Sequence, residues 1–473
     1  MASVIGTEQN PLRVAIIGSG PSGFYAAGHI LSPKAHPGLV AEVDVFDRLP
    51  TPWGLVRGGV APDHPNIKAV SRVYEKTAAR PGFRFFGNVE FGRDIFHEDL
   101  VSHYHAVIYA VGAEADKRMG IPGEDLPGSV AATSFVAWYN GHPDYRHLEF
   151  DLSVRRAVVV GNGNVAMDVA RMLALTPAEL ERTDVADHAL EALRDSAIEE
   201  ILLLGRRGPA QAAFTNPELL ELGEMVDADV LVDPRDVALD EHSAASIEGE
   251  GEITSRRNVE ILTRYSAAQA AGKRRRIVLR FLVSPVAVHG EDRVRGVEVV
   301  HNQLHPHETG GLRARATDRR ETIEAGIVFR SIGYRGVPLP GVPFDEQRAT
   351  IPNREGRVVG PDGETVRGEY TVGWIKRGPS GVIGTNKKDA NETVDRLLED
   401  VAAGAVIEPA DPAPQSVEAL LNERRPDHVT YSGWQAIDAL ERATGEPHGR
   451  PRVKLASFDE LLAAARETVR SSL

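Results

Sequence analysis

The chain has 473 residues, of which 42% are hydrophobic and 26% charged, and its formal net charge is −14 at pH 7. This composition is typical of a soluble globular protein, and the length predicts two or three domains. The acidic balance argues against general nucleic-acid binding, which needs a basic face, and no stretch reaches the roughly 18–20 apolar residues of a membrane span.

The chain contains no cysteine. Disulfide bonds, thiolate nucleophiles and cysteine-bound zinc or iron–sulfur clusters are therefore excluded, and we expect redox chemistry to use a bound organic cofactor. We predict no metal site. The N-terminal residues lack a basic segment followed by an apolar one, so we predict no secretory signal and a cytoplasmic enzyme.

The first predicted elements are an apolar strand at residues 14–17, a glycine-rich turn and a helix. The turn carries Gly18, Gly20 and Gly23 in the spacing G-x-G-x-x-G. In this motif the first glycine permits the tight turn, the second lets the backbone approach a pyrophosphate, and the third lets helix and strand pack closely. Asp47 closes the next strand, where an acid can bind a ribose hydroxyl. This predicts a dinucleotide site, the alternative being an ordinary glycine-rich turn and a solvated acid.

The same order of strand, glycine turn and helix restarts in residues 155–174. The turn runs from Gly161 through Asn162, Gly163, Asn164 and Val165 to Ala166, which is the G-x-G-x-x-A variant of the motif. Two such segments predict an α/β protein with two Rossmann-like dinucleotide-binding domains.

Residues 198–207 supply the strand after the second motif, and this strand ends in Arg206 and Arg207 instead of an acid. A carboxylate would repel a ribose 2′-phosphate, whereas guanidinium groups bind it bidentately. Charge-assisted hydrogen bonds contribute about 1.5–3 kcal/mol each, and about 1.4 kcal/mol is tenfold in affinity. The arginines therefore predict a preference for NADP over NAD, the alternative being a solvated basic turn.

Further strands are predicted from apolar runs at residues 42–50, 105–113, 276–290, 295–304 and 321–336. The runs at 276–290 and 295–304 are expected to form an antiparallel meander, and the run at 321–336 to return to the first domain. Residues 240–258 are polar and predict a surface excursion. Residues 370–401 end in an amphipathic helix, and the tail from about residue 410 is expected to contain helices.

Three stretches narrow the choice among flavoproteins with two such domains. They are "TPWGLVRGGVAPDHPNIK" (51–68), "LGRRGPAQAAFTNPELLEL" (204–222) and "VGWIKRGPSGVIGTNKKDA" (372–390). Together they resemble the adrenodoxin reductase type of NADPH–ferredoxin reductase, and the resemblance runs over nearly the whole chain. It implies an FAD domain built from residues 1–115 and 331–473, with an NADP domain, residues 116–330, inserted between them.

The resemblance also implies that NADPH passes a hydride to N5 of FAD, and that single electrons then go to a ferredoxin, an acidic iron–sulfur protein. It further implies a monomer. The implied FAD residues are Gly23, Asp47, Leu55, Val89, Trp374, Gly381, Val382 and Ile383. The implied NADP(H) residues are Lys117, Asn162, Gly163, Asn164, Val165, Arg206, Arg207 and Glu218, with Gly381 also near the nicotinamide. Asp47 stands where many relatives have glutamate, and Lys117 where they often have arginine.

His64 and Glu221 match the pair that this family places beside the nicotinamide and the flavin ring, and the resemblance assigns them proton handling or hydrogen bonding there. From the residues alone, His64 reads as a turn residue and Glu221 as a solvated helix charge. Glu218 could complete a capping box with Thr215.

An acidic chain repels an acidic ferredoxin, so we expect docking to use a local basic patch. Candidates are Arg256, Arg257, Arg264 and the basic run 273–276, the alternative being a solvated basic surface. A disulfide reductase is excluded because it needs a redox-active cysteine pair. Two alternative functions remain, an FAD- and NADPH-dependent monooxygenase and an FAD/NADP redox-sensing protein without turnover.

Overall fold

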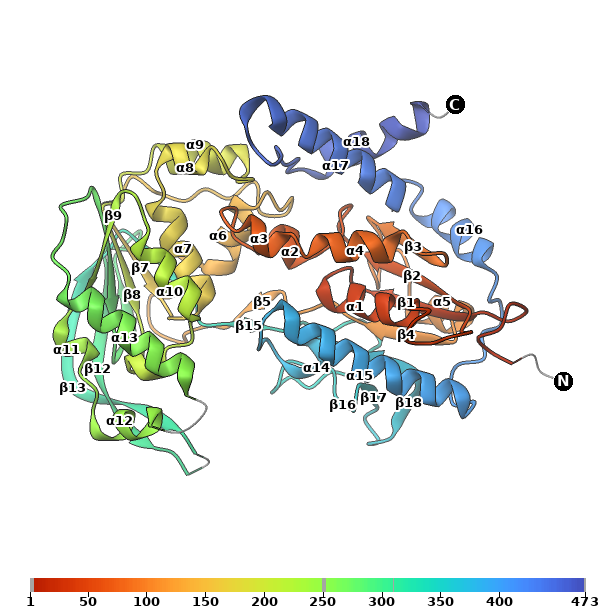
Figure 1. The fold of residues 1–473 in the computed structure, drawn as a ribbon, viewed down its shortest axis with the longest axis horizontal. Coiled ribbons are helices and arrows are strands. Elements are labelled where there is room, and N and C mark those ends of the chain that lie inside the picture. Colours follow the sequence, from red (N-terminus) through yellow and green to blue (C-terminus); the bar gives the residue numbers. More distant parts are fainter. Residues whose placement is uncertain (1–3, 249–251, 309, 472–473) are drawn as a thin grey trace.

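The computed structural model describes residues 4–248, 252–308 and 310–471. Figure 1 shows two units side by side, each a sheet covered by helices, which we call the first unit (on the right) and the second unit (on the left). None of the helices in the described residues is long and apolar enough to cross a membrane.

The first unit is built on an eight-stranded sheet of order β16-β17-β18-β4-β1-β2-β3-β19. The strands from β18 to β3 are parallel, as expected of strands joined by helical crossovers. The central strand β1 is buried along its whole length because helices cover both faces of the sheet. The strands are β1 Leu12–Ile17, β2 Ala41–Asp47, β3 Phe83–Gly87, β4 Ala106–Tyr109, β16 Asn353–Arg354, β17 Arg357–Val359, β18 Thr365–Thr371 and β19 Val429–Thr430.

Helices from both ends of the chain pack on this sheet. Helices α1 and α15 lie side by side against the face of the sheet in Figure 1, and α17 and α18 pack together along the upper edge. The helices are α1 Pro21–Ile30, α2 Leu55–Gly58, α3 Pro65–Lys68, α4 Ser71–Ala78, α5 His97–His103, α14 Trp374–Arg377, α15 Ile383–Ala402, α16 Pro414–Arg424, α17 Tyr431–Gly445 and α18 Phe458–Ser471, with the 3-10 turn η2 Glu446–His448.

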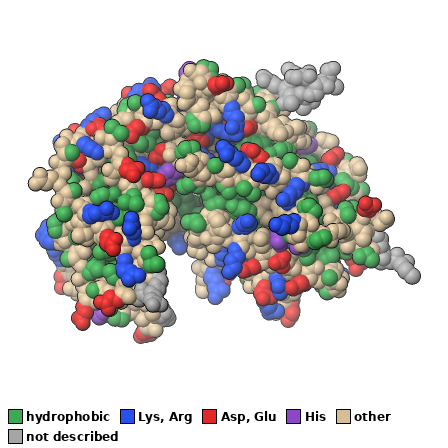
Figure 2. All heavy atoms as spheres, in the orientation of Figure 1, with side chains coloured by type: hydrophobic (Ala, Val, Ile, Leu, Met, Phe, Trp, Pro, Cys, Tyr) green, Lys and Arg blue, Asp and Glu red, His purple; other side chains and the backbone are tan. Residues whose placement is uncertain are grey.

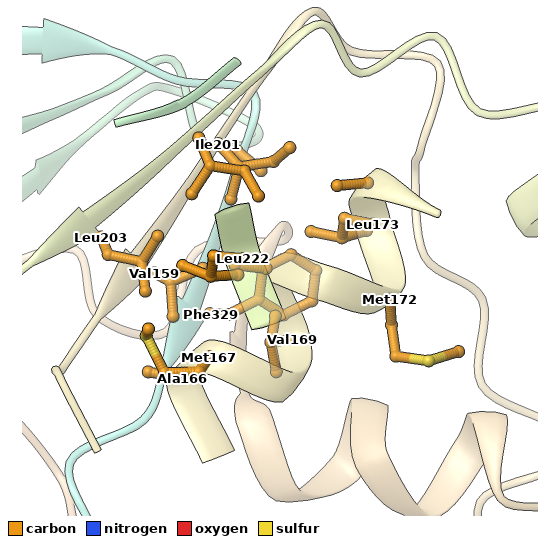
Figure 3. Packing of buried hydrophobic residues seen from close by; sticks show 14 of the residues in the cluster. Val159, Ala166, Met167, Val169, Met172, Leu173, Ile201, Leu203, Leu222 and Phe329 are labelled. Atoms are coloured by element: carbon orange, nitrogen blue, oxygen red, sulfur yellow. The ribbon is translucent and has the colours of Figure 1, made fainter. Parts of the chain in front are cut away.

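The second unit is built on a six-stranded sheet of order β6-β14-β7-β8-β10-β9, in which every neighbouring pair is parallel. Figure 3 shows Val159, Met167, Leu203 and Phe329 packed together in its core. The strands are β6 Ser129–Ala131, β7 Arg156–Val160, β8 Glu200–Leu204, β9 Ala228–Val232, β10 Arg275–Arg280 and β14 Ile327–Arg330. The helices are α6 Ala132–Tyr139, α7 Asn164–Ala174, α8 Pro177–Leu180, α9 Asp187–Arg194, α10 Asn216–Gly223, α11 Pro234–Val237, α12 Glu241–Ile247 and α13 Ile253–Ala267, with the 3-10 turn η1 Pro209–Gln211.

Two small antiparallel sheets complete the fold. Strands β11 Val283–His289, β12 Gly296–Pro306 and β13 Leu312–Glu324 form a meander beside the second unit. Strands β5 Ala115–Asp116 and β15 Tyr334–Arg335 pair with each other. Because β5 follows β4 of the first unit and β15 follows β14 of the second, the chain crosses between the units in both directions at this ribbon.

Two expectations for the strands were wrong. The run 276–290 is not one strand of the meander. It divides at Leu282, which has a φ of 56°, so that β10 stays in the six-stranded sheet and β11 begins the meander. The run 321–336 does not return to the first unit as a strand, because it ends β13 and then adds β14 to the six-stranded sheet. The chain returns only after Arg330.

The polar stretch 240–258 is also more regular than expected. It contains α12 and the start of α13, while residues 249–251 lie outside the described part of the chain. Both helices are largely exposed but bury a polar side chain, Ser243 on α12 and Asn258 on α13. The C-terminal tail likewise adds the strand β19 to its helices, and two residues are too few to leave a strand pattern in the sequence.

Candidate functional site

The first glycine turn joins β1 to α1 at the carboxyl edge of the eight-stranded sheet. Gly18 has a φ of 106°, and a Cβ there would lie 2.6 Å from the carbonyl oxygen of Ala110, so only glycine fits. A Cβ on Gly23 would lie 2.2 Å from the carbonyl oxygen of Gly18. A Cβ on Gly20 would meet no described atom within 4 Å. Space for a ligand is therefore open at the N-terminus of α1, where backbone amides attract an anion.

Asp47 ends β2 beside this turn. Its carboxylate accepts hydrogen bonds from the amide (2.9 Å) and hydroxyl (2.5 Å) of Ser19 and from the amide of Leu49 (2.9 Å). Burial raises the pKa of Asp47, and these hydrogen bonds oppose the rise. Val89 lies alongside, because its amide donates to the carbonyl of Asp47 at 2.9 Å. The side chain of Val89 is buried in the core, so a ligand could reach only its backbone.

A second group of implied FAD residues lies at the starts of α2, α14 and α15. Leu55 is 39% exposed and Val382 is 60% exposed, although both are apolar. The ring of Trp374 lies 5.2 Å from that of Tyr334, and its indole nitrogen is buried without a hydrogen-bond partner in the described chain. These features fit a planar aromatic ligand, which would cover the exposed apolar side chains and accept a hydrogen bond from the buried indole nitrogen.

Gly381 and Ile383 belong to the same group. Gly381 has a φ of 80°, which allows the chain to turn into α15, and Ile383 is the first residue of this 20-residue helix. The first turn of α15 contains no acidic residue. The N-terminal end of α15 is therefore electropositive and favours a ligand that gains negative charge.

The second glycine turn joins β7 to α7 and repeats the geometry of the first. Gly161 has a φ of 134°, and a Cβ there would lie 2.1 Å from the carbonyl oxygen of Ser331. A Cβ on Gly163 would meet no described atom within 4 Å. The N-terminus of α7, which begins at Asn164 and Val165, is thus as open as that of α1.

The two asparagines of this turn differ in role. The side-chain oxygen of Asn164 accepts a hydrogen bond from the amide of Thr215 at 2.9 Å, which fastens the turn to the start of α10. The side-chain nitrogen of Asn162 is buried with no hydrogen-bond partner among the described residues. Asn162 therefore offers an unused donor beside the turn.

Arg206 and Arg207 follow β8 on the same edge of the sheet. The carbonyl of Arg206 is held by the side chain of Asn302 at 2.8 Å. Burial, and then the adjacent Arg206 guanidinium, lowers the pKa of Arg207, and no described acid counters that shift. A bound anion would relieve the repulsion between the two guanidinium groups.

Lys117 lies on the ribbon where the chain crosses between the units. Its amide donates to the carbonyl of Gly333 at 3.0 Å, and its side chain is exposed. Its neighbour Arg118 forms an ion pair with Asp125 at 2.6 Å. Lys117 is therefore the available cation of the two.

His64 and Glu221 meet across the boundary between the units. His64 precedes α3 of the first unit, Glu221 lies on α10 of the second, and His64 Nε2 is 2.8 Å from Glu221 Oε2. Behind the imidazole, a terminal nitrogen of Arg171 lies 3.4 Å from His64 Nδ1. A guanidinium can only donate, so Nδ1 accepts. A neutral His64 therefore carries its proton on Nε2 and donates a hydrogen bond from there to Glu221.

Arg171, on α7, is 3% exposed and joins the same boundary from the second unit. It donates to Asp63 at 2.5 Å, to Asp168 at 2.6 Å and to Glu218 at 3.0 Å. Burial disfavours its charge, but the carboxylates of Asp63 and Asp168 outweigh burial and hold the pKa of Arg171 above its usual value. Arg171 is the cation around which the boundary is assembled.

His64, Asp168 and Glu218 each offer a ligand atom, and these atoms lie within 4.8 Å of one another. Arg171 already contacts all three groups. The guanidinium thus supplies the positive charge that a metal ion would supply, and the cluster is an ion-pair network.

Burial, followed by the negative charge of Asp168, raises the pKa of Glu218 to about 7. Glu218 therefore holds a proton for part of the time at neutral pH and can donate as well as accept. The capping-box alternative is wrong. Thr215 is the N-cap residue of α10, but no described side chain caps it, and the Glu218 carboxylate turns to Arg171, a stronger charged partner.

The sequence did not reveal Asp63, Asp168 or Arg171. Asp168 and Arg171 stand three residues apart on α7, within an otherwise apolar helix that follows the second glycine turn. Two charged residues at that spacing on a buried helix could have indicated a buried ion pair at this place. Their partners lie on α10 and before α3, which no local pattern connects.

The chain has relatives of known name. The profile of the family described as pyridine nucleotide-disulphide oxidoreductase matches residues 12–204. NADPH-ferredoxin reductase FprA of Mycobacterium leprae is 52% identical over 95% of this chain and 97% of its own length. The mitochondrial NADPH:adrenodoxin oxidoreductase of Arabidopsis thaliana is 42% identical over 97% of this chain and 96% of its own. A solved structure, Mycobacterium tuberculosis FprA in complex with NADPH, matches with a TM-score of 0.91 and 50% identity, over 96% of this chain and 100% of that one.

Proposed function

This chain belongs to the family of NADPH–ferredoxin reductases, and from that premise we propose that it takes a hydride from NADPH onto FAD and passes single electrons to a ferredoxin. The observation that carries the proposal is the contact of 2.8 Å between His64 and Glu221. It brings together two units that each present an open glycine turn at a helix N-terminus. Two dinucleotides bound at these turns would extend toward the same boundary.

The residues of the first unit fit FAD. The open turn at Gly20 would hold the pyrophosphate, and the Asp47 carboxylate would bind a ribose hydroxyl. Leu55, Trp374 and the segment Gly381–Ile383 would line the ring system. When bound, FAD accepts the hydride and releases electrons one at a time, which no side chain of this cysteine-free chain can do.

The residues of the second unit fit NADPH. The N-terminus of α7 at Gly163 would hold the pyrophosphate, and the unused donor of Asn162 lies beside it. Arg206 and Arg207 would bind the 2′-phosphate, which gives the preference for NADPH over NADH. Lys117 would add a positive charge without the bidentate fork of an arginine.

At the boundary, the chain's own residues position the nicotinamide. His64, held between Arg171 and Glu221, donates a hydrogen bond from Nε2 to Glu221 and so fixes α10 against the first unit. Glu218, protonated part of the time, can donate a hydrogen bond to a carboxamide oxygen. Hydride transfer depends more on positioning than on proton transfer, so these residues act mainly by orientation.

We also propose the domain boundaries 1–115, 116–330 and 331–473. In support, β1 to β4 and β16 to β19 form one sheet, while β6 to β10 and β14 form another. The β5–β15 ribbon lies at both crossings between them. A monomer and a cytoplasmic location remain proposals, which sedimentation velocity of the holoenzyme and cell fractionation test.

For the ferredoxin we propose a docking surface on the exposed arginines Arg256, Arg257 and Arg264 of α13. Figure 2 shows a hollow between the two units with Lys and Arg side chains on both of its sides, and Figure 1 places the start of α13 beside it. Positive charge there would attract an acidic partner to the boundary.

The run 273–276 is less suitable for docking, because each of its side chains is engaged in the fold. Lys273 donates to the carbonyl of Met225, Arg274 to that of Ser196 and Arg275 to that of Leu175, while Arg276 forms an ion pair with Glu200.

Stopped-flow spectroscopy of the FAD-loaded enzyme tests the function. We expect NADPH to bleach the flavin absorbance much faster than NADH, and ferredoxin to restore it. Arg206→Ala should weaken NADPH use by roughly tenfold to hundredfold while leaving NADH use unchanged. Equal losses with both nucleotides would contradict the role of Arg206. Hydroxylation of a small substrate in place of ferredoxin reduction, or flavin reduction without turnover, would overturn the proposal in favour of a monooxygenase or a redox sensor.

A further inference from the structure

Residues 449–456, which lie between η2 and α18, leave the first unit, contact the second and return to the first at α18. We call this segment the C-terminal strap. In Figure 1 it leaves α17 at the upper edge and runs beside α8 and α9. The strap has no regular helix or strand in its described residues, so side chains and single backbone bonds hold it in place.

On the side of the first unit, the strap is anchored to Glu441, which is fully buried. The Glu441 carboxylate accepts from the amide of Leu455 at 2.9 Å and from Arg452 at 3.0 Å. The same carboxylate binds both terminal nitrogens of Arg57, on α2, at 2.6 and 2.8 Å. The strap is thereby fixed to the helix that begins at Leu55.

On the side of the second unit, two cations of the strap reach the loop between α8 and α9. Arg450 donates to the carbonyls of Thr183 and Val185, and binds the carboxylate of Asp187 at 2.5 Å. Lys454, whose side chain is 1% exposed, lies 3.4 Å from a carboxylate oxygen of Asp184. These contacts join the strap to the second unit.

Asp184 also links the strap to the boundary between the units, where His64 lies. Its carboxylate also binds Lys68 at 2.6 Å, and Lys68 is the last residue of α3, the helix that begins directly after His64. Asn140, at the end of α6, accepts from both Lys454 (2.9 Å) and Lys68 (3.5 Å). A chain of buried polar contacts therefore runs from the strap to the helix that holds His64.

These charges are costly to bury. Burial lowers the pKa of Lys68 and of Lys454. The carboxylate of Asp184 offsets this only in part, because it faces both ammonium groups. Burial also opposes the ionisation of Asp184, but the two lysines outweigh it and lower the pKa of Asp184 to about 2. Replacing a buried ion cluster by apolar side chains is often neutral for stability, so we expect this cluster to specify one arrangement of the two units rather than to stabilise the fold.

We propose that the C-terminal strap holds the two units at the spacing at which His64 meets Glu221, and that Lys454 is a positioning residue for hydride transfer. The inference rests on the proposed function. Neither Lys454 nor Asp184 contacts His64, so both act through Lys68 and α3. Loss of the strap contact should let the nicotinamide and the flavin separate without removing any group that binds either one.

The test uses Lys454→Met and Arg450→Met in the FAD-loaded enzyme, with Lys76→Met, exposed on α4, as the matched control. Lys454→Met leaves Asp184 paired with Lys68. Arg450→Met removes the donor to two carbonyls, but the one carboxylate that loses its ion pair, Asp187, is 59% exposed, so both variants should fold. The measurements are flavin reduction by NADPH in stopped flow, its isotope effect with NADPH deuterated at C4, and reoxidation by ferricyanide. Hydrogen exchange of the α3 amides, measured without NADPH, reports the arrangement independently of turnover.

We expect both strap variants to lower the rate of flavin reduction by roughly tenfold to hundredfold, with NADPH affinity nearly unchanged and a larger isotope effect. Exchange at α3 should rise in both, and Lys76→Met should match the wild type. Unchanged reduction rates in the FAD-loaded variants would overturn the proposal, even if their FAD content or melting temperature fell. If the wild type itself is not reduced by NADPH, the proposed function fails, which is a different result from a wild type that works beside unaffected variants.

Discussion

Arg171 faces the carboxylates of Asp63, Asp168 and Glu218, and its single charge cannot balance all three. The shortfall appears at Glu218, whose pKa is raised to about 7 because burial and Asp168 both disfavour its negative charge. The same guanidinium faces His64 Nδ1 and so directs the imidazole proton to Nε2, toward Glu221. Arg171 thus opposes the rise in the Glu218 pKa without cancelling it, and it favours the His64 tautomer with the proton on Nε2.

Arg171→Met tests this role. Removing one partner from a buried ionic cluster leaves the carboxylates unpaired and costs about 3–5 kcal/mol. We expect the free energy of unfolding in urea to fall by that amount and flavin reduction by NADPH to slow. The control Arg155→Met removes an arginine that is 80% exposed and paired with Glu199, and should have a much smaller effect. Equal losses in the two variants would contradict a central role for Arg171.

Glu218→Gln tests the raised pKa. A carboxyl group whose pKa rises from 4.5 to about 7 on folding contributes stability that is complete below pH 4.5 and is lost as the pH passes 7. Glutamine cannot ionise, so the melting temperature of the variant relative to the wild type should climb between pH 5 and pH 8 and level off above. Thermal melts across that range measure it, with the exposed Glu408→Gln as control. Parallel curves at every pH would show that Glu218 titrates normally.

The two glycine turns have the same local design, and we propose that each binds one nucleotide. In each, the first glycine is required by a positive φ, while the second leaves room at a helix N-terminus. Gly20 and Gly163 have φ values of −74° and −98°, which any residue can adopt. Side chains at these two positions would therefore change ligand binding and leave the fold intact.

Gly20→Val and Gly163→Val form a matched pair. Gly20→Val should lower the FAD content of the purified protein, because its methyl groups would occupy the space at the start of α1. Gly163→Val should keep full FAD content but weaken NADP⁺ binding by at least about tenfold, a loss of about 1.4 kcal/mol. Flavin absorbance and calorimetric titration give the two readings. If each variant lost both ligands equally, the assignment of one nucleotide to each unit would be wrong.

At the scale of the whole molecule, a chain of net charge −14 would repel the acidic ferredoxin that we propose as its partner. Repulsion between the two is screened beyond a Debye length of about 10 Å at 0.1 M salt, so a local group of cations can dominate the encounter. The start of α13, which carries Arg256 and Arg257, lies beside the hollow between the units, where electrons would leave. Charge and position therefore both favour docking of ferredoxin at the start of α13.

Replacing Arg256 and Arg257 together by alanine tests that face. We expect kcat/KM for ferredoxin to fall at low salt and to approach the wild-type value near 1 M salt, where the Debye length is about 3 Å. Reduction of ferricyanide, which needs no docking surface, should not change. Arg155→Ala removes an exposed charge just before β7 and serves as the control. A defect independent of salt would argue against electrostatic docking at α13.

The sequence predicted the features that depend on neighbouring residues. The glycine spacing, the apolar strands before it and the arginines at the end of β8 are local patterns, and the structure has each of them where the sequence placed it. The pairing of His64 with Glu221 came from the family resemblance alone. The contact between them is present in the structure, although their catalytic role stays a prediction.

Strand order and the polar networks were beyond the sequence. The break at Leu282, the place of β14 between β6 and β7, and the addition of β19 depend on which strand edge was available once the sheets had formed.

The sequence by itself determined two glycine turns between strand and helix, an arginine pair in place of an acid after the second, and a chain without cysteine, because backbone turns and burial periodicity are encoded over short stretches. Only the tertiary structure brought Arg171 to His64 and joined Lys454 to Lys68 through Asp184. Those contacts link segments more than a hundred residues apart, and they exist only where two sheets are held at one spacing.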